Sequence, residues 1–164
     1  TGGLTPRRSP ELPKGSPSMF QEQLSQALSI PTNPTHAAAQ TASFNTGGVD
    51  LQKFERCMAI IDVGTVTAGT LDAKWQESAD NSSFSDVAGF SNLAITQITA
   101  SNKTVTMEIR ASQLSSGKRY VRVAVTLGSS PNLVVAVILL GGEAHQKPAS
   151  ANDAAHVTER KVVS

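Results

Sequence analysis

The chain has 164 residues and a mass of 17.1 kDa, a size that fits one domain and leaves little room for two. Its 14 basic and 13 acidic residues give a formal net charge of +1, so no overall excess of charge favours binding to nucleic acid or to an anionic membrane. Only 16% of the residues are charged and there is a single cysteine, which excludes an internal disulfide and leaves mainly Ser, Thr, Asn and Gln as polar residues.

Residues 1–35 are rich in proline and contain no apolar stretch of the kind found in export signals. We expect an extended arm here. Within residues 19–28 (MFQEQLSQAL), apolar side chains recur every fourth residue at Phe20, Leu24 and Leu28. This spacing predicts a short amphipathic helix that is marginal in water unless another surface covers its apolar face. These three residues are therefore candidate partner-binding residues.

Residues 36–143 form the body of the chain, and β-branched clusters with alternating polarity predict that it is built from strands. Three short polar segments, 64–69, 101–102 and 129–132, are interpreted as turns, the last of them joining two strands in an antiparallel hairpin. The predicted strands are 54–63, 70–78, 93–99, 104–111, 119–127 and 133–140, with a further one around 41–44. A single all-β domain, either a β-sandwich or a jelly-roll-like barrel, is the expected fold. The polar residues 144–164 are expected to form a C-terminal tail.

The alternation also predicts which residues lie in the core. Segment 119–127 places its valines on one face, whereas Tyr120 and Arg122 face the other way and are further candidates for partner binding. Segment 133–140 (LVVAVILL) is apolar on both faces, which predicts that a second layer covers it. The predicted core residues are Phe54, Trp75, Val121, Val123, Val125, Val135 and Val137.

The sequence contains no pattern that predicts a catalytic site or a metal-binding site. All three histidines lie outside the predicted strands, and no histidine or cysteine pair has metal-ligand spacing. Cys57 lies in the middle of a strand and is interpreted as a small core residue. Residues 80–86 (DNSSFSD), with Asp80, Asn81 and Asp86, lack the glycine and final glutamate of a calcium loop, so the loop is expected to cap its own backbone with its Asn, Ser and Asp side chains. We therefore expect no enzyme activity, no cofactor and no metal.

Three segments of the body carry a resemblance to a known group of proteins. They are VDLQKFERCMAIIDV at 49–63, AKWQESAD at 73–80 with FSDV at 84–87, and KRYVRV at 118–123. Together they resemble small virion proteins encoded near the capsid genes of tailed phages, over roughly residues 49–142. The resemblance implies a β-sandwich present in many copies on the phage head, where it cements neighbouring capsid subunits.

The expected partners are then the major capsid protein and neighbouring copies of this chain, within a homo-oligomer or a large symmetric assembly. The expected location is the capsid surface of a virion assembled in the host cytoplasm. Residues 1–35 and 144–164 lie outside the resemblance and are expected to reach across subunit boundaries. Two alternatives are an accessory protein of the phage neck or tail, and a carbohydrate-binding module that uses Trp75 or Tyr120 as an aromatic platform.

Overall fold

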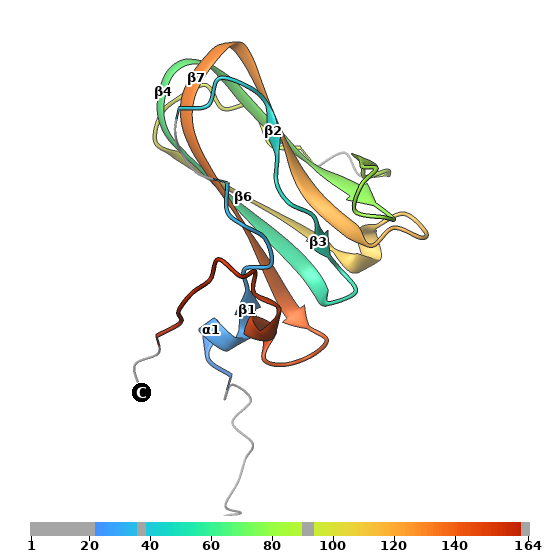
Figure 1. The fold of residues 1–164 in the computed structure, drawn as a ribbon. Helices are drawn as coiled ribbons and strands as arrows, with labels where there is room; N and C mark the ends of the chain where they lie inside the picture. The colour runs from blue at the N-terminus through green and yellow to red at the C-terminus, as the bar shows by residue number, and fades with distance from the viewer. Residues whose placement is uncertain (1–21, 36–38, 90–93, 162–164) are drawn as a thin grey trace, which may run out of the picture.

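The computed structural model describes residues 22–35, 39–89 and 94–161, and it shows a mostly β protein (Figure 1). The prediction of an all-β fold is therefore confirmed. The strands form one curled antiparallel sheet, and the finer prediction of a sandwich or jelly roll stays a prediction. The elements are α1 (Leu24–Ala27), β1 (Leu28–Ser29), β2 (Phe44–Asn45), β3 (Val49–Asp50), β4 (Phe54–Ser78), β5 (Ser85–Asp86), β6 (Lys103–Arg110), η1 (Ala111–Gln113), β7 (Tyr120–Ala144) and η2 (Ala149–Asn152).

Two long strands, β4 and β7, form the centre of the sheet. Each has 25 residues, and they pair from Phe54 opposite Ala144 to Ser78 opposite Tyr120. Residues 28–35 and 39–50 run antiparallel along the other side of β7 and touch it at intervals through β1, β2 and β3. Residues 85–89 and 94–110 follow β4 in the same way through β5 and β6. Most of the described chain is thus arranged around one central pair of strands.

Two of the predicted turns are wrong, because the strands continue through them. β4 runs through residues 64–69, where its register with β7 shifts several times. β7 runs through residues 129–132, where Ser129 and Ser130 adopt positive φ angles of 59° and 53°. Gly69, with φ of 97°, lies against Gly128, whose carbonyl oxygen would be 2.7 Å from an added Cβ. The irregularities face each other, so the paired strands bend together at this point (Figure 1).

The third predicted turn, at residues 101–102, is also wrong. The chain does not reverse there but continues along β4, since Ile98 bridges to Leu71 and β6 then pairs with residues 63–56. Ser101 Oγ accepts a hydrogen bond of 2.9 Å from the backbone N–H of Val66, which lies in the irregular part of β4. The predicted strand 93–99 is reduced, within the described residues, to two isolated bridges to β4.

The bend brings the inner faces of the two halves of the sheet around one hydrophobic core. All seven predicted core residues are buried there, together with Cys57. The prediction that a second layer covers segment 133–140 is not met by the described residues. Only alternate side chains of this segment are buried, and Val134, Ile138 and Leu140 on the opposite face remain partly exposed.

Candidate functional site

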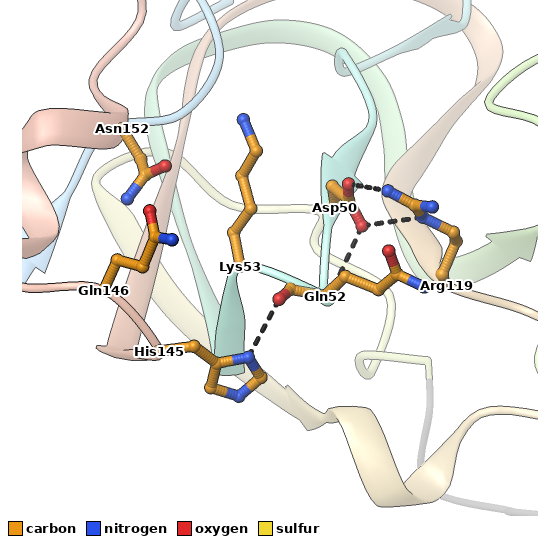
Figure 2. A pocket seen from close by; sticks show the side chains of 7 residues that line it. All are labelled: Asp50, Gln52, Lys53, Arg119, His145, Gln146 and Asn152. Atoms are coloured by element: carbon orange, nitrogen blue, oxygen red, sulfur yellow. Dashed lines mark hydrogen bonds and ion pairs between the residues drawn. The ribbon is translucent and has the colours of Figure 1, made fainter.

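A polar cavity of about 310 Å³ lies where the two ends of β7 and the C-terminal tail come close together. The bend in the sheet is the reason that residues before and after β7, such as Arg119 and His145, line the same space. The turn between β3 and β4 and the helix η2 also line the cavity (Figure 2). The lining residues are Asp50, Gln52, Lys53, Arg119, His145, Gln146 and Asn152.

The turn that forms one wall of the cavity is organised by Asp50. Its Oδ1 accepts a hydrogen bond of 3.0 Å from the backbone N–H of Gln52, and its backbone carbonyl accepts one of 3.1 Å from Lys53. Arg119 forms a two-pronged ion pair with the same carboxylate. Burial acts to raise the pKa of Asp50, but the hydrogen bonds from Arg119 and Gln52 and the positive charge of Arg119 outweigh it and lower that pKa. The pair is therefore ionised and holds the wall in place.

The cavity contains one cation, Lys53, whose charge helps to lower the pKa of Asp50 without a direct ion pair. The amine of Lys53 has no hydrogen-bond or ion-pair partner among the described residues, and it extends between the Asp50–Arg119 pair and the amides of Gln146 and Asn152 (Figure 2). An amine beside two amides provides several hydrogen-bond donors. This arrangement suits a carboxylate or another small anionic group.

His145 is held by the wall of the cavity and not by a catalytic partner. Its Nδ1 lies 2.8 Å from the carbonyl oxygen of Gln52, so this nitrogen carries a proton and donates it. Its Nε2 lies 3.7 Å from a carboxylate oxygen of Glu55. The seven lining residues include no hydroxyl and no thiol, so the cavity offers no side-chain nucleophile for an imidazole to activate.

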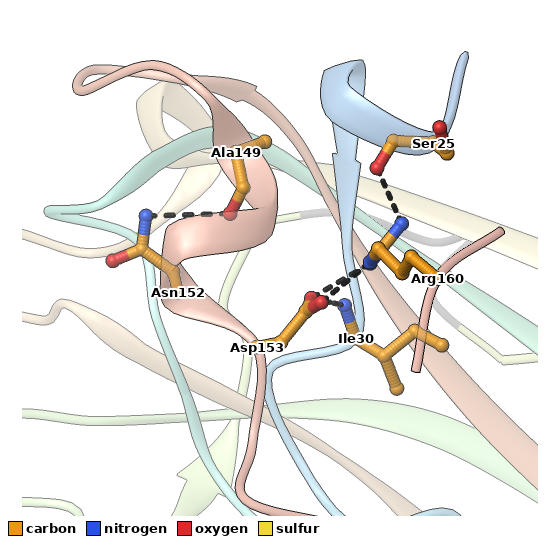
Figure 3. Close-up of polar contacts among 6 residues, drawn as sticks. All are labelled: Ser25, Ile30, Ala149, Asn152, Asp153 and Arg160. Atoms are coloured by element: carbon orange, nitrogen blue, oxygen red, sulfur yellow. Dashed lines mark hydrogen bonds and ion pairs between the residues drawn. The ribbon is translucent and has the colours of Figure 1, made fainter. Parts of the chain in front are cut away.

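Next to the cavity, the C-terminal tail is fastened to the first described residues. Asp153 accepts a hydrogen bond of 2.8 Å from the backbone N–H of Ile30, and the backbone N–H of Ala154 donates one of 2.9 Å to the carbonyl oxygen of Ile30. Arg160 forms an ion pair with Asp153 and donates to the carbonyl oxygen of Ser25 (Figure 3). We call this set of contacts among Ser25, Ile30, Asp153, Ala154 and Arg160 the terminal clasp.

The contacts of the terminal clasp keep Asp153 ionised. Burial acts to raise the pKa of Asp153, but hydrogen bonds from Arg160 and from the backbone of Ile30 outweigh it and lower that pKa. Both side chains are mostly shielded, with exposed fractions of 25% for Arg160 and 12% for Asp153. The clasp therefore holds residues 22–30 and 149–160 of the same chain together at one end of the sheet.

The predicted amphipathic helix is shorter than expected. Helix α1 has four residues, and Leu28 lies beyond it in β1, where it pairs with Gly142. Leu24 is 75% exposed and is the exposed large hydrophobic residue of the described chain. Phe20 lies outside the described residues. The helical spacing of Leu24 and Leu28 is thus interrupted because β7 offers strand pairing to Leu28.

The two other candidate partner residues contact their own chain. Arg122 donates hydrogen bonds of 3.0 and 2.8 Å to the side-chain oxygen of Gln76, and its guanidinium lies 4.1 Å from the ring centre of Phe84. Tyr120 lies beneath the guanidinium of Arg119, 4.9 Å from its ring centre. Both candidate partner-binding residues are therefore engaged in contacts within the chain.

Two predictions about local chemistry agree with the geometry. Asp80 Oδ1 accepts hydrogen bonds from the backbone N–H groups of Ser82 and Ser83, at 2.9 and 2.8 Å, and these bonds together with that from Ser78 lower the pKa of Asp80 to about 2. Cys57 is fully buried, and burial raises the pKa of its thiol to about 12. The loop residue caps its own backbone, and the cysteine is inaccessible to solvent.

One buried carboxylate was missed by the sequence reasoning. Glu77 is only 2% exposed and accepts a hydrogen bond of 2.9 Å from the backbone N–H of Ser115, which ties the loop after η1 to β4. The signal was present, because Glu77 continues the alternation of Leu71, Ala73 and Trp75 toward the inner face. The cavity residues had no such signal, since they come from four separate segments of the chain.

Within the part of the chain that the structure describes, no group of three or more His, Cys, Asp or Glu side chains is placed to hold a metal ion. The same residues contain no helix with the length and apolar character needed to cross a membrane. Comparisons with protein-family models and with curated proteins find no match for this chain.

Proposed function

We propose that this chain is a structural protein of a tailed-phage particle, which decorates the capsid and cements neighbouring capsid subunits. The observation that carries this proposal is the terminal clasp. It fastens the first and last described segments to each other and to the sheet, so the described chain begins and ends at the same end of a rigid body (Figure 1). The segments before and after the described residues are therefore both attached to the body at the terminal clasp.

Attachment of both segments at one place favours the bridging of subunits. A tethered segment has a high effective concentration near its neighbour, so its contact adds to the affinity of the contact made by the body itself. Of the segments expected to reach across subunit boundaries, 1–35 and 144–164, the described parts contact their own chain. We propose that the remaining residues, 1–21 and 162–164, contact the capsid protein. The proline-rich sequence of residues 1–21 suits an extended arm of this kind.

The cavity supports binding to a protein group more than catalysis. The unpaired amine of Lys53 beside two amides suits the carboxylate of an aspartate or glutamate on a neighbouring subunit. Its seven lining residues contribute no hydroxyl and no thiol, and the thiol of Cys57 is buried in the core. We therefore propose a non-enzymatic role in which Lys53 contributes one contact to the capsid.

The alternative of a carbohydrate-binding module is less well supported. An aromatic platform must be exposed to stack on a sugar, whereas Trp75 is 1% exposed and lies in the core. Tyr120 is partly covered by Arg119. A position at the neck or tail of the particle uses the same fold, and it differs from the cementing role in the number of copies per particle.

The test uses heads of the phage that encodes this chain, and these heads are prepared so that they lack the chain. Purified chain is titrated onto the heads, bound copies are counted, and the temperature at which the heads open is recorded. Saturation at hundreds of copies with a raised opening temperature is the expected result. Saturation at a few copies indicates the neck or tail, and absence of binding contradicts a role in the virion.

A pair of matched variants tests the contribution of the cavity. Lys53→Gln removes the unpaired cation, and we expect it to weaken binding to heads about tenfold or more, as for a lost charged contact. Lys103→Gln removes another exposed lysine, at the start of β6 near the bend, and this variant is expected to bind as the unchanged chain does. Equal effects of the two substitutions would remove the cavity from the proposed interface.

A further inference from the structure

The outer face of one half of the sheet carries a row of large apolar side chains. Met58 lies opposite Leu140, and Ile60 lies opposite Ile138 in the register of β4 and β7. Residues directly opposite each other in an antiparallel pair have side chains on the same face, about 5 Å apart. All four side chains are partly exposed. They form one continuous patch, which we call the apolar patch.

The apolar patch has a polar border. Arg56 lies at one end of it on β4 and Asp62 at the other end, while Thr104 and Thr106 lie beside it on β6. Both threonines are exposed, as is Asp62. An apolar centre with a polar border is the usual anatomy of a protein–protein interface.

Each end of the patch holds one charged side chain that has no ion pair among the described residues. At one end Arg56 and Arg110 lie opposite each other, and Arg56 is paired with Glu108 at 3.3 Å and Glu143 at 2.9 Å. Arg110 has no ion pair among the described residues. At the other end, Asp62 accepts a hydrogen bond of 2.6 Å from Thr104 and likewise has no ion pair in the described chain. One cation and one anion are therefore left without a charged partner at opposite ends.

We propose that this face binds a second copy of the same chain through a two-fold axis. The axis lies between two copies stacked face to face and runs perpendicular to the strands, at the level of Ala59. Stacking of this kind reverses the strand direction, so Arg110 of one copy lies over Thr104 of its partner and one strand spacing from the partner's Asp62. Each such contact is made twice. The same operation places the Met58 pair of one copy over the Ile60 pair of the other.

The size of the face sets the strength of the contact. The three strands β6, β4 and β7, each about 4.8 Å wide, and about eight residues of 3.3 Å give a face of about 380 Å². This is smaller than the roughly 800 Å² that each partner buries in a standard interface. We therefore expect a concentration-dependent dimer with a dissociation constant in the micromolar range. The inference is independent of the proposed role on a capsid.

The first experiment measures the oligomeric state of the full chain by sedimentation velocity, from about 1 to 300 μM. A monomer–dimer equilibrium is expected, and Ile60→Asp should abolish it. Ala68→Asp introduces the same charge at an exposed position in the bend and should leave the equilibrium unchanged. Far-ultraviolet circular dichroism and thermal unfolding verify that each variant is folded.

The second experiment tests the orientation of the two copies. Asp62→Arg and Arg110→Asp should each weaken the dimer about tenfold, because two like-charged contacts replace two attractive ones. The double variant restores opposite charges across the interface and should recover affinity to within about threefold of the unchanged chain. Absence of recovery would overturn the two-fold arrangement. A full chain that stays monomeric at all concentrations would overturn the proposal, and would indicate that another protein or the chain's own residues 1–21 cover the patch.

Discussion

Two adjacent glycines of β7 should respond in opposite ways to the same substitution. A Cβ added at Gly141 would lie 2.7 Å from two ring carbons of Phe54, a side chain that is fully buried. A Cβ added at Gly142 points to the other face of the strand, where its nearest neighbour is Cγ of Arg56 at 3.5 Å. The first contact is a clash with a side chain that cannot move into solvent, and the second is ordinary van der Waals contact.

The expected magnitudes follow from this difference. Overpacking of a core costs about 1–3 kcal/mol, whereas replacing glycine by alanine in a strand stabilises by about 0.5–1 kcal/mol. Gly141→Ala should therefore lower the free energy of unfolding by about 1–2 kcal/mol. Gly142→Ala should leave it unchanged or raise it slightly. For a domain of this size the two melting temperatures should differ by about 4–8 °C.

Denaturant unfolding of both variants at neutral pH measures the difference. Phe54→Val removes the ring, so Gly141→Ala should cost little in that background, with a coupling energy of about 1–2 kcal/mol between the two positions. Equal unfolding midpoints for the two alanine variants would refute the reasoning. An unchanged cost of Gly141→Ala without the ring would refute it as well.

Three further predictions concern the terminal clasp and the core. The pKa of Asp153 is lowered in the folded chain, so its ion pair stabilises the fold above the ordinary carboxyl pKa near 4, and this contribution is lost as the pH falls through the lowered value. Arg160→Gln should therefore cost about 1–2 kcal/mol at pH 7 and less at pH 2.5, and equal costs in denaturant unfolding at both pH values would contradict this. Cys57 should resist thiol reagents at pH 8 until the chain is unfolded, since its pKa is raised to about 12, and rapid labelling of the native chain would show that the strand opens. Trp75→Ala should cost about 3–5 kcal/mol, and the native Trp75 fluorescence should be little quenched by acrylamide; strong quenching would place the ring in solvent.

The parts of the fold that sequence predicts well are those that depend on local periodicity. The valines at 121, 123 and 125 face the core because every second residue of a strand does so, whatever the strand pairs with. The capping of loop 80–86 by its own polar side chains is also predictable, since the hydrogen bonds to Asp80 reach only two and three residues along the chain. Neither inference requires knowledge of a distant contact.

The errors arose where one local signal has two structural meanings. Glycine at 69 and the pair Ser129 and Ser130 adopt positive φ, which occurs in a reversing turn and equally in a bend that a strand passes through. Only the partner strand distinguishes the two cases, and here β4 and β7 bend at the same level. The cavity was missed for a related reason, because its walls meet only after the sheet has bent.

The pairing of β4 with β7 has a consequence for how the chain folds. Ser78 and Tyr120 are roughly half as far apart along the chain as Phe54 and Ala144 at the other end of the same ladder. Closing the shorter loop costs about 0.7 kcal/mol less in chain entropy. The ladder should therefore begin near Ser78 and lengthen toward Phe54, so that the clasped end of the protein forms last. A fold dominated by such distant pairings should reach its native state slowly for its size, over milliseconds to seconds.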